Sequence, residues 1–242
     1  MSNIFDVLLK IQTTIVVCIA VGSGYVYQHN PLLFGQKTVY EESSHNITNY
    51  TIYDHYPNLD DELFPLASSL GKNLTAYRNH CLRVLTFAKF FLPESTEQDL
   101  PNAMDLAATA IAYHRVGLWT DKNLNYLESS KDQLDKALES SFTPKEMKIM
   151  REIILQQHKV TDYTEMSSET ENALVNAVRK ASWADATMGL IRFDLPASLL
   201  EAAYDQLQEA GFHKLIWEMN TKLSPGIGIM SGIMEAGKIV KW

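Results

Sequence analysis

Apolar residues recur at helical spacing through most of the chain beyond residue 58. In the segment that begins near Leu59, leucines recur every three or four residues behind an acidic first turn, which is typical of an amphipathic helix. The same spacing predicts further helices over residues 74–91, 100–113, 124–138, 144–158, 171–190 and 196–211. No stretch alternates convincingly between apolar and polar residues, so we predict an all-α helical bundle. Prolines mark the starts or breaks of its helices at Pro93, Pro101, Pro144 and Pro196.

The most apolar helical pattern lies within residues 103–119, AMDLAATAIAYHRVGLW. Four alanines and an isoleucine between residues 107 and 112 leave almost no polar surface. We therefore expect this helix in the middle of the bundle. It delivers His114 and Arg115 at its C-terminal end, where Gly117 interrupts the run.

The N-terminal residues 1–28 follow a different pattern. Residues 11–28 carry no charge and have about the minimum length for crossing a bilayer. Lys10 before them and tyrosines behind them favour a single-pass membrane anchor. A slight positive excess before the segment, from the amino terminus and Lys10 against Asp6, would place the domain outside the cytoplasm, but the side of the membrane stays open. A cleaved signal peptide is one alternative. The other is a helix packed on a soluble cytoplasmic protein, because polar residues such as Asp6 and Gln12 dilute the apolar signal.

Residues 29–57 are polar and rich in tyrosine, with little helical period. They are expected to form a linker, or an extended wrap over the domain surface. The helical domain then occupies residues 58–242.

Composition narrows the function classes. The 242 residues, 46% of them hydrophobic, suffice for one globular core. A net charge of −8, without any run of three basic residues, excludes a nucleic-acid-binding surface, which needs clustered Lys and Arg. Only two cysteines occur, Cys18 and Cys81, and Cys18 lies in the apolar N-terminal stretch, so a disulfide framework is not expected.

Three histidines and one aspartate provide the candidate chemistry. His80, His114 and His158 fall on separate predicted helices, and Asp185 is flanked by tryptophan, alanine and methionine. A carboxylate in such surroundings is costly unless a cation or hydrogen bonds satisfy it. Each histidine alone could be a helix cap or a surface group, and Asp185 alone could be an interhelical hydrogen-bond acceptor. Together they favour a metal site, because bundles build such sites from imidazoles and carboxylates on facing helices.

These motifs, in their order along the chain, resemble the HD-domain superfamily. They are YRNHCLRVL with His80, AIAYHRVGLW with His114, ILQQHKVTDY with His158 and VRKASWADATMGL with Asp185. The resemblance covers roughly residues 74–218. It implies an all-helical, HD-domain-like bundle. Most families with this pattern are metal-dependent phosphohydrolases, and a minority are hydratases, lyases or oxygenases.

Residue by residue, the resemblance implies that His80, His114 and Asp185 are ligands of a divalent metal ion, which could be Mn, Fe, Mg or Zn. His158 resembles an additional histidine that helps to hold a second metal or contacts the substrate. Lys159 beside it could meet a phosphate, so these two residues are the implied catalytic pair.

The chain departs from the family at the centre of the motif, where Arg115 stands in place of the family's Asp. A guanidinium cannot be a metal ligand, which leaves at best a single ion. One function is therefore a mononuclear hydrolase of a phosphate ester or related small molecule, with His158 as proton donor. The alternative is a catalytically inactive, membrane-tethered module that binds an anion through Arg115, Lys159 and the histidines, or that serves as an interaction module. The substrate and the oligomeric state stay open.

Overall fold

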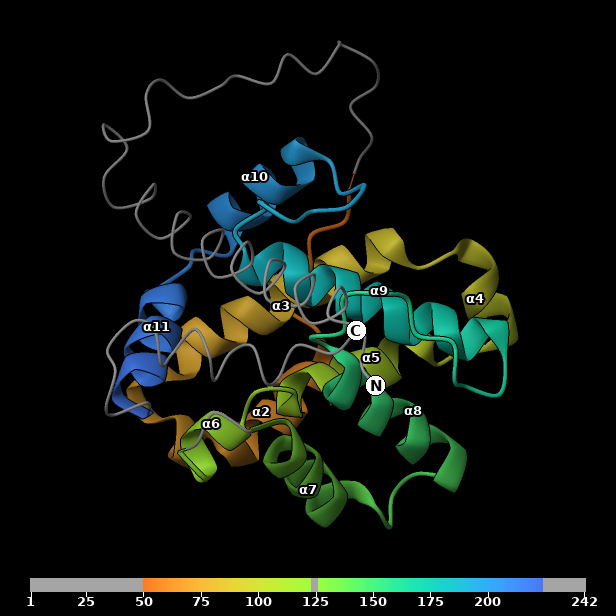
Figure 1. Ribbon diagram of the computed structural model, residues 1–242, viewed down its shortest axis with the longest axis horizontal. Coiled ribbons are helices and arrows are strands. Elements are labelled where there is room, and N and C mark those ends of the chain that lie inside the picture. The colour runs from red at the N-terminus through yellow and green to blue at the C-terminus, as the bar shows by residue number, and fades with distance from the viewer. Residues whose placement is uncertain (1–49, 123–125, 224–242) are drawn as a thin grey trace, which may run out of the picture.

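The computed structural model describes residues 50–122 and 126–223 (Figure 1). Within these residues the chain is helical and forms no strand, which confirms the all-α class for this part of the protein. The helices are α2 (Pro57–Leu70), α3 (Leu74–Phe91), α4 (Glu94–Asp99), α5 (Ala103–Tyr113), α6 (Gly117–Thr120), α7 (Tyr126–Leu138), α8 (Pro144–Gln156), α9 (Glu169–Ala186), α10 (Ala197–Gln206) and α11 (Phe212–Leu223), with a 3₁₀ turn η2 (Gly71–Asn73) after α2.

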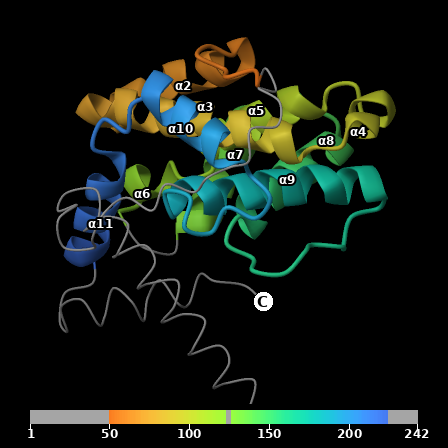
Figure 2. The same cartoon turned by 90° about the horizontal axis from the view of Figure 1, so that it is seen from above.

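Helix α5 lies inside the bundle, as its alanine-rich sequence predicts. Every residue of α5 except Asp105 is buried. The helix packs against α2, α3 and α8 (Figures 1 and 2). Small side chains allow these neighbours to approach α5 closely, so the core forms around it.

The turn between α5 and α6 holds His114 and Arg115 in a fixed position. The hydroxyl of Tyr77, on α3, donates to the carbonyl of Ala112 at 3.1 Å and accepts the backbone N–H of Arg115 at 3.1 Å. One buried phenol therefore ties this turn to α3. Its two hydrogen bonds satisfy backbone groups that the end of α5 leaves open.

Gly117 allows α7 to lie close behind this turn. A Cβ at position 117 would lie 2.5 Å from the backbone oxygen of Tyr126, closer than any side chain permits. Gly117 is the first residue of α6. Because it has no Cβ, Tyr126 of α7 can lie next to the turn.

Helices α3 and α9 lie side by side along the molecule (Figure 2). Ser168 caps the start of helix α9, because its Oγ accepts the backbone N–H of Glu171 at 3.2 Å, a typical N-cap. Where the two helices meet, His80 and Arg83 of α3 face Asp185 of α9.

Several helix boundaries follow the sequence pattern closely. Helix α3 has the predicted bounds, and α8 begins at Pro144 behind a capping box of Thr143 and Glu146. The short helices α4 and α6 and the helix α11 were not predicted as separate elements.

Residues 50–56 lie against the core, where the Tyr53 N–H donates to Thr86 Oγ1 at 3.1 Å.

The predicted membrane anchor and most of the predicted linker lie outside the described residues. Among the helices of residues 50–122 and 126–223, none is long and apolar enough to cross a membrane.

Candidate functional site

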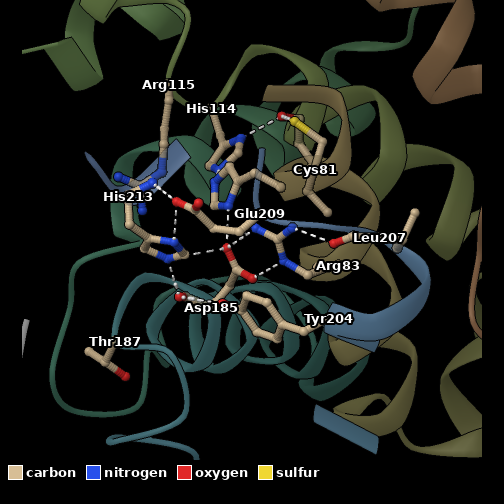
Figure 3. Close-up of polar contacts among 12 residues, drawn as sticks. Cys81, Arg83, His114, Arg115, Asp185, Thr187, Tyr204, Leu207, Glu209 and His213 are labelled. Carbon is tan, nitrogen blue, oxygen red and sulfur yellow. Dashed lines mark hydrogen bonds and ion pairs between the residues drawn. The ribbon is translucent and has the colours of Figure 1, made fainter. Parts of the chain in front are cut away.

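The centre of the site is an ion pair between Arg83 and Asp185, both fully buried (Figure 3). Arg83 donates from Nε to Asp185 Oδ1 at 2.5 Å and from Nη2 to Oδ2 at 3.2 Å. His80 Nδ1 lies 2.5 Å from Oδ2 of the same carboxylate. Burial alone would raise the pKa of Asp185, but Arg83 and His80 hold it well below its usual value. Asp185 is therefore an ionised carboxylate with both oxygens occupied.

The chain from α10 to α11 closes over this ion pair. The guanidinium of Arg83 lies 4.5 Å from the ring centroid of Tyr204, and it donates to the carbonyl of Leu207 at 2.8 Å. His213 Nε2 donates to the backbone oxygen of Asp185 at 2.8 Å (Figure 3). Phe212 stacks on His80 with ring centroids 4.0 Å apart. The aromatic start of α11 thus covers the site.

His80 and His114 face each other through their Nε2 atoms, which lie 3.1 Å apart. The Nδ1 atom of each ring faces an oxygen that can only accept, Asp185 Oδ2 for His80 and the carbonyl of Ile111 for His114. These partners assign a proton to both Nδ1 atoms. Burial lowers the pKa of His80 to about 3 and that of His114 well below its usual value. Two neutral rings so arranged turn their Nε2 lone pairs toward each other, the arrangement in which two imidazoles can hold a cation between them.

The three residues implied as metal ligands are therefore neighbours, but they lie in a row. Asp185 directs its oxygens to His80 and Arg83, on the side of His80 away from His114. In the part of the chain that the structure describes, no group of three or more His, Cys, Asp and Glu side chains is arranged to hold a metal ion. The ligand role of Asp185 stays a prediction.

A second cluster forms around Arg115, which is 5% exposed. Its Nη1 donates to the hydroxyl of Tyr126 at 3.0 Å, and that hydroxyl lies 2.5 Å from His158 Nε2. Since the hydroxyl accepts from Arg115, its own proton is available to His158. Arg115 and His158, both predicted as site residues, are thus joined by Tyr126, which the sequence does not single out.

The remaining nitrogens of Arg115 distinguish it from the other buried charges. Its Nε and Nη2 atoms are buried without a hydrogen-bond partner. Elsewhere in the described residues, each buried charged side chain meets an opposite charge. These pairs are Arg83 with Asp185, Glu171 with Lys145, and Arg179 with Asp162. Among the described residues Arg115 is the one buried charge for which no ion pair forms.

Lys159 is held to α9 by its backbone. Its carbonyl accepts from Trp183 Nε1 and from Arg179 Nη1, both at 3.1 Å. The ring of Trp183 also lies edge-on to His158, with centroids 6.3 Å apart. The loop after α8 therefore places Lys159 beside the Arg115 cluster through main-chain contacts.

Fold and site together define, for the described residues, an all-α protein with a closed and strongly charged interior. Comparisons of the chain with protein-family models, with curated proteins and with solved structures found no match.

Proposed function

We propose that this protein is an HD-like module that binds a small anion at Arg115, tethered to a membrane by its N-terminal segment. The observation that carries the proposal is the pair of buried, unpartnered N–H groups on Arg115. Anion binding replaces metal binding at this position because the family's carboxylate has become a guanidinium, which attracts anions and repels cations.

Energetics support an occupant at Arg115. Leaving one member of a buried ion pair alone costs about 3–5 kcal/mol, and each unsatisfied buried polar group costs about 1–3 kcal/mol. Water could accept the two N–H bonds but would not neutralise the charge. An anion does both, so a bound anion removes a cost that the fold otherwise carries.

The charges around Arg115 support the same conclusion. Asp185 is neutralised by Arg83, so it cannot also balance Arg115. The charge of Arg115 acts on both His80 and His114 and helps to lower their pKa values, although burial is the larger cause. At His114 the charge effects of His80, Arg115 and His158 all lower the pKa of the ring, as expected where the surroundings favour a negatively charged ligand.

Thermal unfolding of the full chain in the presence of added anions tests the proposal. At one hundred times its Kd an anion should stabilise the protein by about 2.7 kcal/mol, which is a rise of roughly 5–10 °C in Tm for a chain of this size. Arg115→Met should abolish the rise. Arg151→Met is the matched control, because it removes a partly exposed arginine that is paired with Asp135. A rise that persists in Arg115→Met would refute the proposal.

A metal-dependent hydrolase is the second candidate, and the facing His80 and His114 favour it. Two nitrogens bound at about 2.0–2.1 Å lie roughly 3.4 Å apart on a tetrahedral ion and roughly 2.9 Å apart on an octahedral one. Their Nε2 separation of 3.1 Å fits two adjacent ligands. Asp185 would then orient His80 through its Nδ1, and His158 would be the nearby proton donor. A divalent ion would polarise a phosphoryl group and lower the pKa of a bound water.

The charge count weighs against this second candidate. Arg83 and Arg115 already place two guanidinium groups near the histidine pair, and Asp185 balances only one of them. A divalent ion would add two positive charges to this buried region. We therefore place the anion-binding function first.

A further inference from the structure

We propose that the anion bound at Arg115 is a monocarboxylate, gripped side-on by Nε and Nη2 of this residue; the inference rests on the proposed function and specifies its ligand. One edge of the Arg115 guanidinium is left without a hydrogen-bond partner. Nη1 is taken by Tyr126, whereas Nε and Nη2 are the two buried nitrogens without one. Their N–H groups point in the same direction, as two parallel donors.

The same chain shows what that edge binds. Arg83 uses Nε and Nη2 to hold the two oxygens of Asp185, at 2.5 and 3.2 Å (Figure 3). Arg78 uses Nε and Nη2 to hold the two oxygens of Asp60, at 2.5 and 3.0 Å. Both are carboxylates bound side-on through two parallel hydrogen bonds, an arrangement that matches the spacing of carboxylate oxygens. Arg115 presents the same edge with no protein carboxylate opposite it among the described residues.

The charge of the cluster selects a single negative charge. Arg115 carries the one positive charge there that no ion pair balances in the described part of the chain. Tyr126 Oη and His158 Nε2 lie 2.5 Å apart, in a contact between a hydroxyl and a ring nitrogen and not in an ion pair. A monoanion neutralises Arg115, whereas a phosphate or sulfate dianion would leave one buried charge uncompensated. The site should therefore prefer a carboxylate over a phosphate.

The orientation of Arg115 is fixed before a ligand arrives. Tyr126 holds Nη1 at 3.0 Å, and the hydroxyl of Tyr126 is itself held by His158 at 2.5 Å. Little side-chain freedom is then lost on binding, which favours affinity for a small ligand. Because Arg115 is 5% exposed and its Nε and Nη2 atoms are buried, the carboxylate end of the ligand would be buried.

Calorimetric titration of the full chain with acetate, chloride, sulfate and inorganic phosphate at pH 8 tests the inference. We expect acetate to bind at least tenfold more tightly than sulfate or phosphate. In Arg115→Lys the charge remains but the parallel donors are lost, so acetate affinity should fall at least tenfold. The ¹⁵Nε–¹H signal of Arg115, assigned by its absence in Arg115→Lys, should shift on addition of acetate.

The outcomes separate the inference from the proposed function. If none of the four anions binds, both fail, and a carboxylate of the chain itself would be the better occupant of Arg115. If sulfate or phosphate binds at Arg115 as tightly as acetate, the anion site stands and the carboxylate inference fails. If Arg115→Lys binds acetate as tightly as the wild type, the side-on geometry is wrong.

Discussion

Arg83 and Asp185 form a bidentate ion pair in which both side chains are wholly buried, with Nε and Oδ1 2.5 Å apart. Removing two charges from water is costly, and the pair offsets that cost through its geometry and through the further bond from His80 to Asp185. Within this arrangement Asp185 anchors α3 to α9 and fixes the ring of His80. Asp185 thereby sets the direction in which His80 Nε2 faces His114.

The first prediction follows from this pair. Arg83→Met leaves Asp185 buried without its cation, so the free energy of unfolding should fall by about 3–5 kcal/mol. Urea unfolding measures the loss. Arg151→Met, which breaks a partly exposed pair with Asp135, is the control and should cost less than about 1 kcal/mol. The double variant Arg83→Met with Asp185→Asn should recover part of the stability lost in Arg83→Met. If Arg83→Met and Arg151→Met lose the same amount of stability, the buried pair is not the cause and this prediction is wrong.

A second prediction concerns Glu209, which accepts from the backbone N–H and the ring of His213 at the start of α11. Burial would raise its pKa, but the bonds from His213 outweigh burial and lower the pKa to about 2. Because the folded-state pKa lies below the unfolded value of about 4.3, Glu209 stabilises the fold at pH above that value. The contribution is lost as the pH falls toward 2.

Comparison of wild type with Glu209→Gln between pH 6 and pH 3 checks the sign. At pH 6 the wild type should be more stable, by roughly 1 kcal/mol after allowance for solvent screening. This difference should shrink as the pH falls below 5. A difference that stays constant or grows in acid would show that Glu209 is not stabilised as its carboxylate.

Much of the fold could be predicted because helical periodicity and caps are local signals. The bounds of α3 and the capped start of α8 at Pro144 follow from them. Helices α4 and α6 are one or two turns long, too short for a periodic pattern to appear. Helix α11 is fixed by the contacts of Phe212 and His213 with His80 and Asp185, which are contacts across the fold.

Part of the side-chain cluster could also be predicted from local features of the sequence. His80, His114 and Asp185 could be chosen by residue type and apolar surroundings, and the structure brings these three together. Arg83 is recognisable in the sequence as a charged residue three positions after His80 within an apolar run. Tyr126 has no such feature in the sequence, because its contact with Arg115 depends on how closely α7 packs against Gly117.

The last prediction tests whether position 115 decides between an anion and a cation. Arg115→Asp removes a positive charge that acts on both His80 and His114 and places a carboxylate beside His114. With two nitrogens already 3.1 Å apart, this supplies an additional anionic ligand in a partly desolvated site. Affinity for Mn²⁺ should rise at least tenfold, which is about 1.4 kcal/mol or more.

Calorimetric titration of wild type, Arg115→Asp and Arg115→Met with Mn²⁺ measures this rise. The Met variant removes the charge without adding a ligand, so it should fall between the other two. Adding His114→Ala to Arg115→Asp should abolish the gain, because one of the two imidazole nitrogens is then lost. Arg115→Asp should also lose its response to acetate. If all three proteins bind Mn²⁺ equally while unfolding cooperatively, Arg115 does not control the histidine pair, and His114 loses its support as a metal ligand.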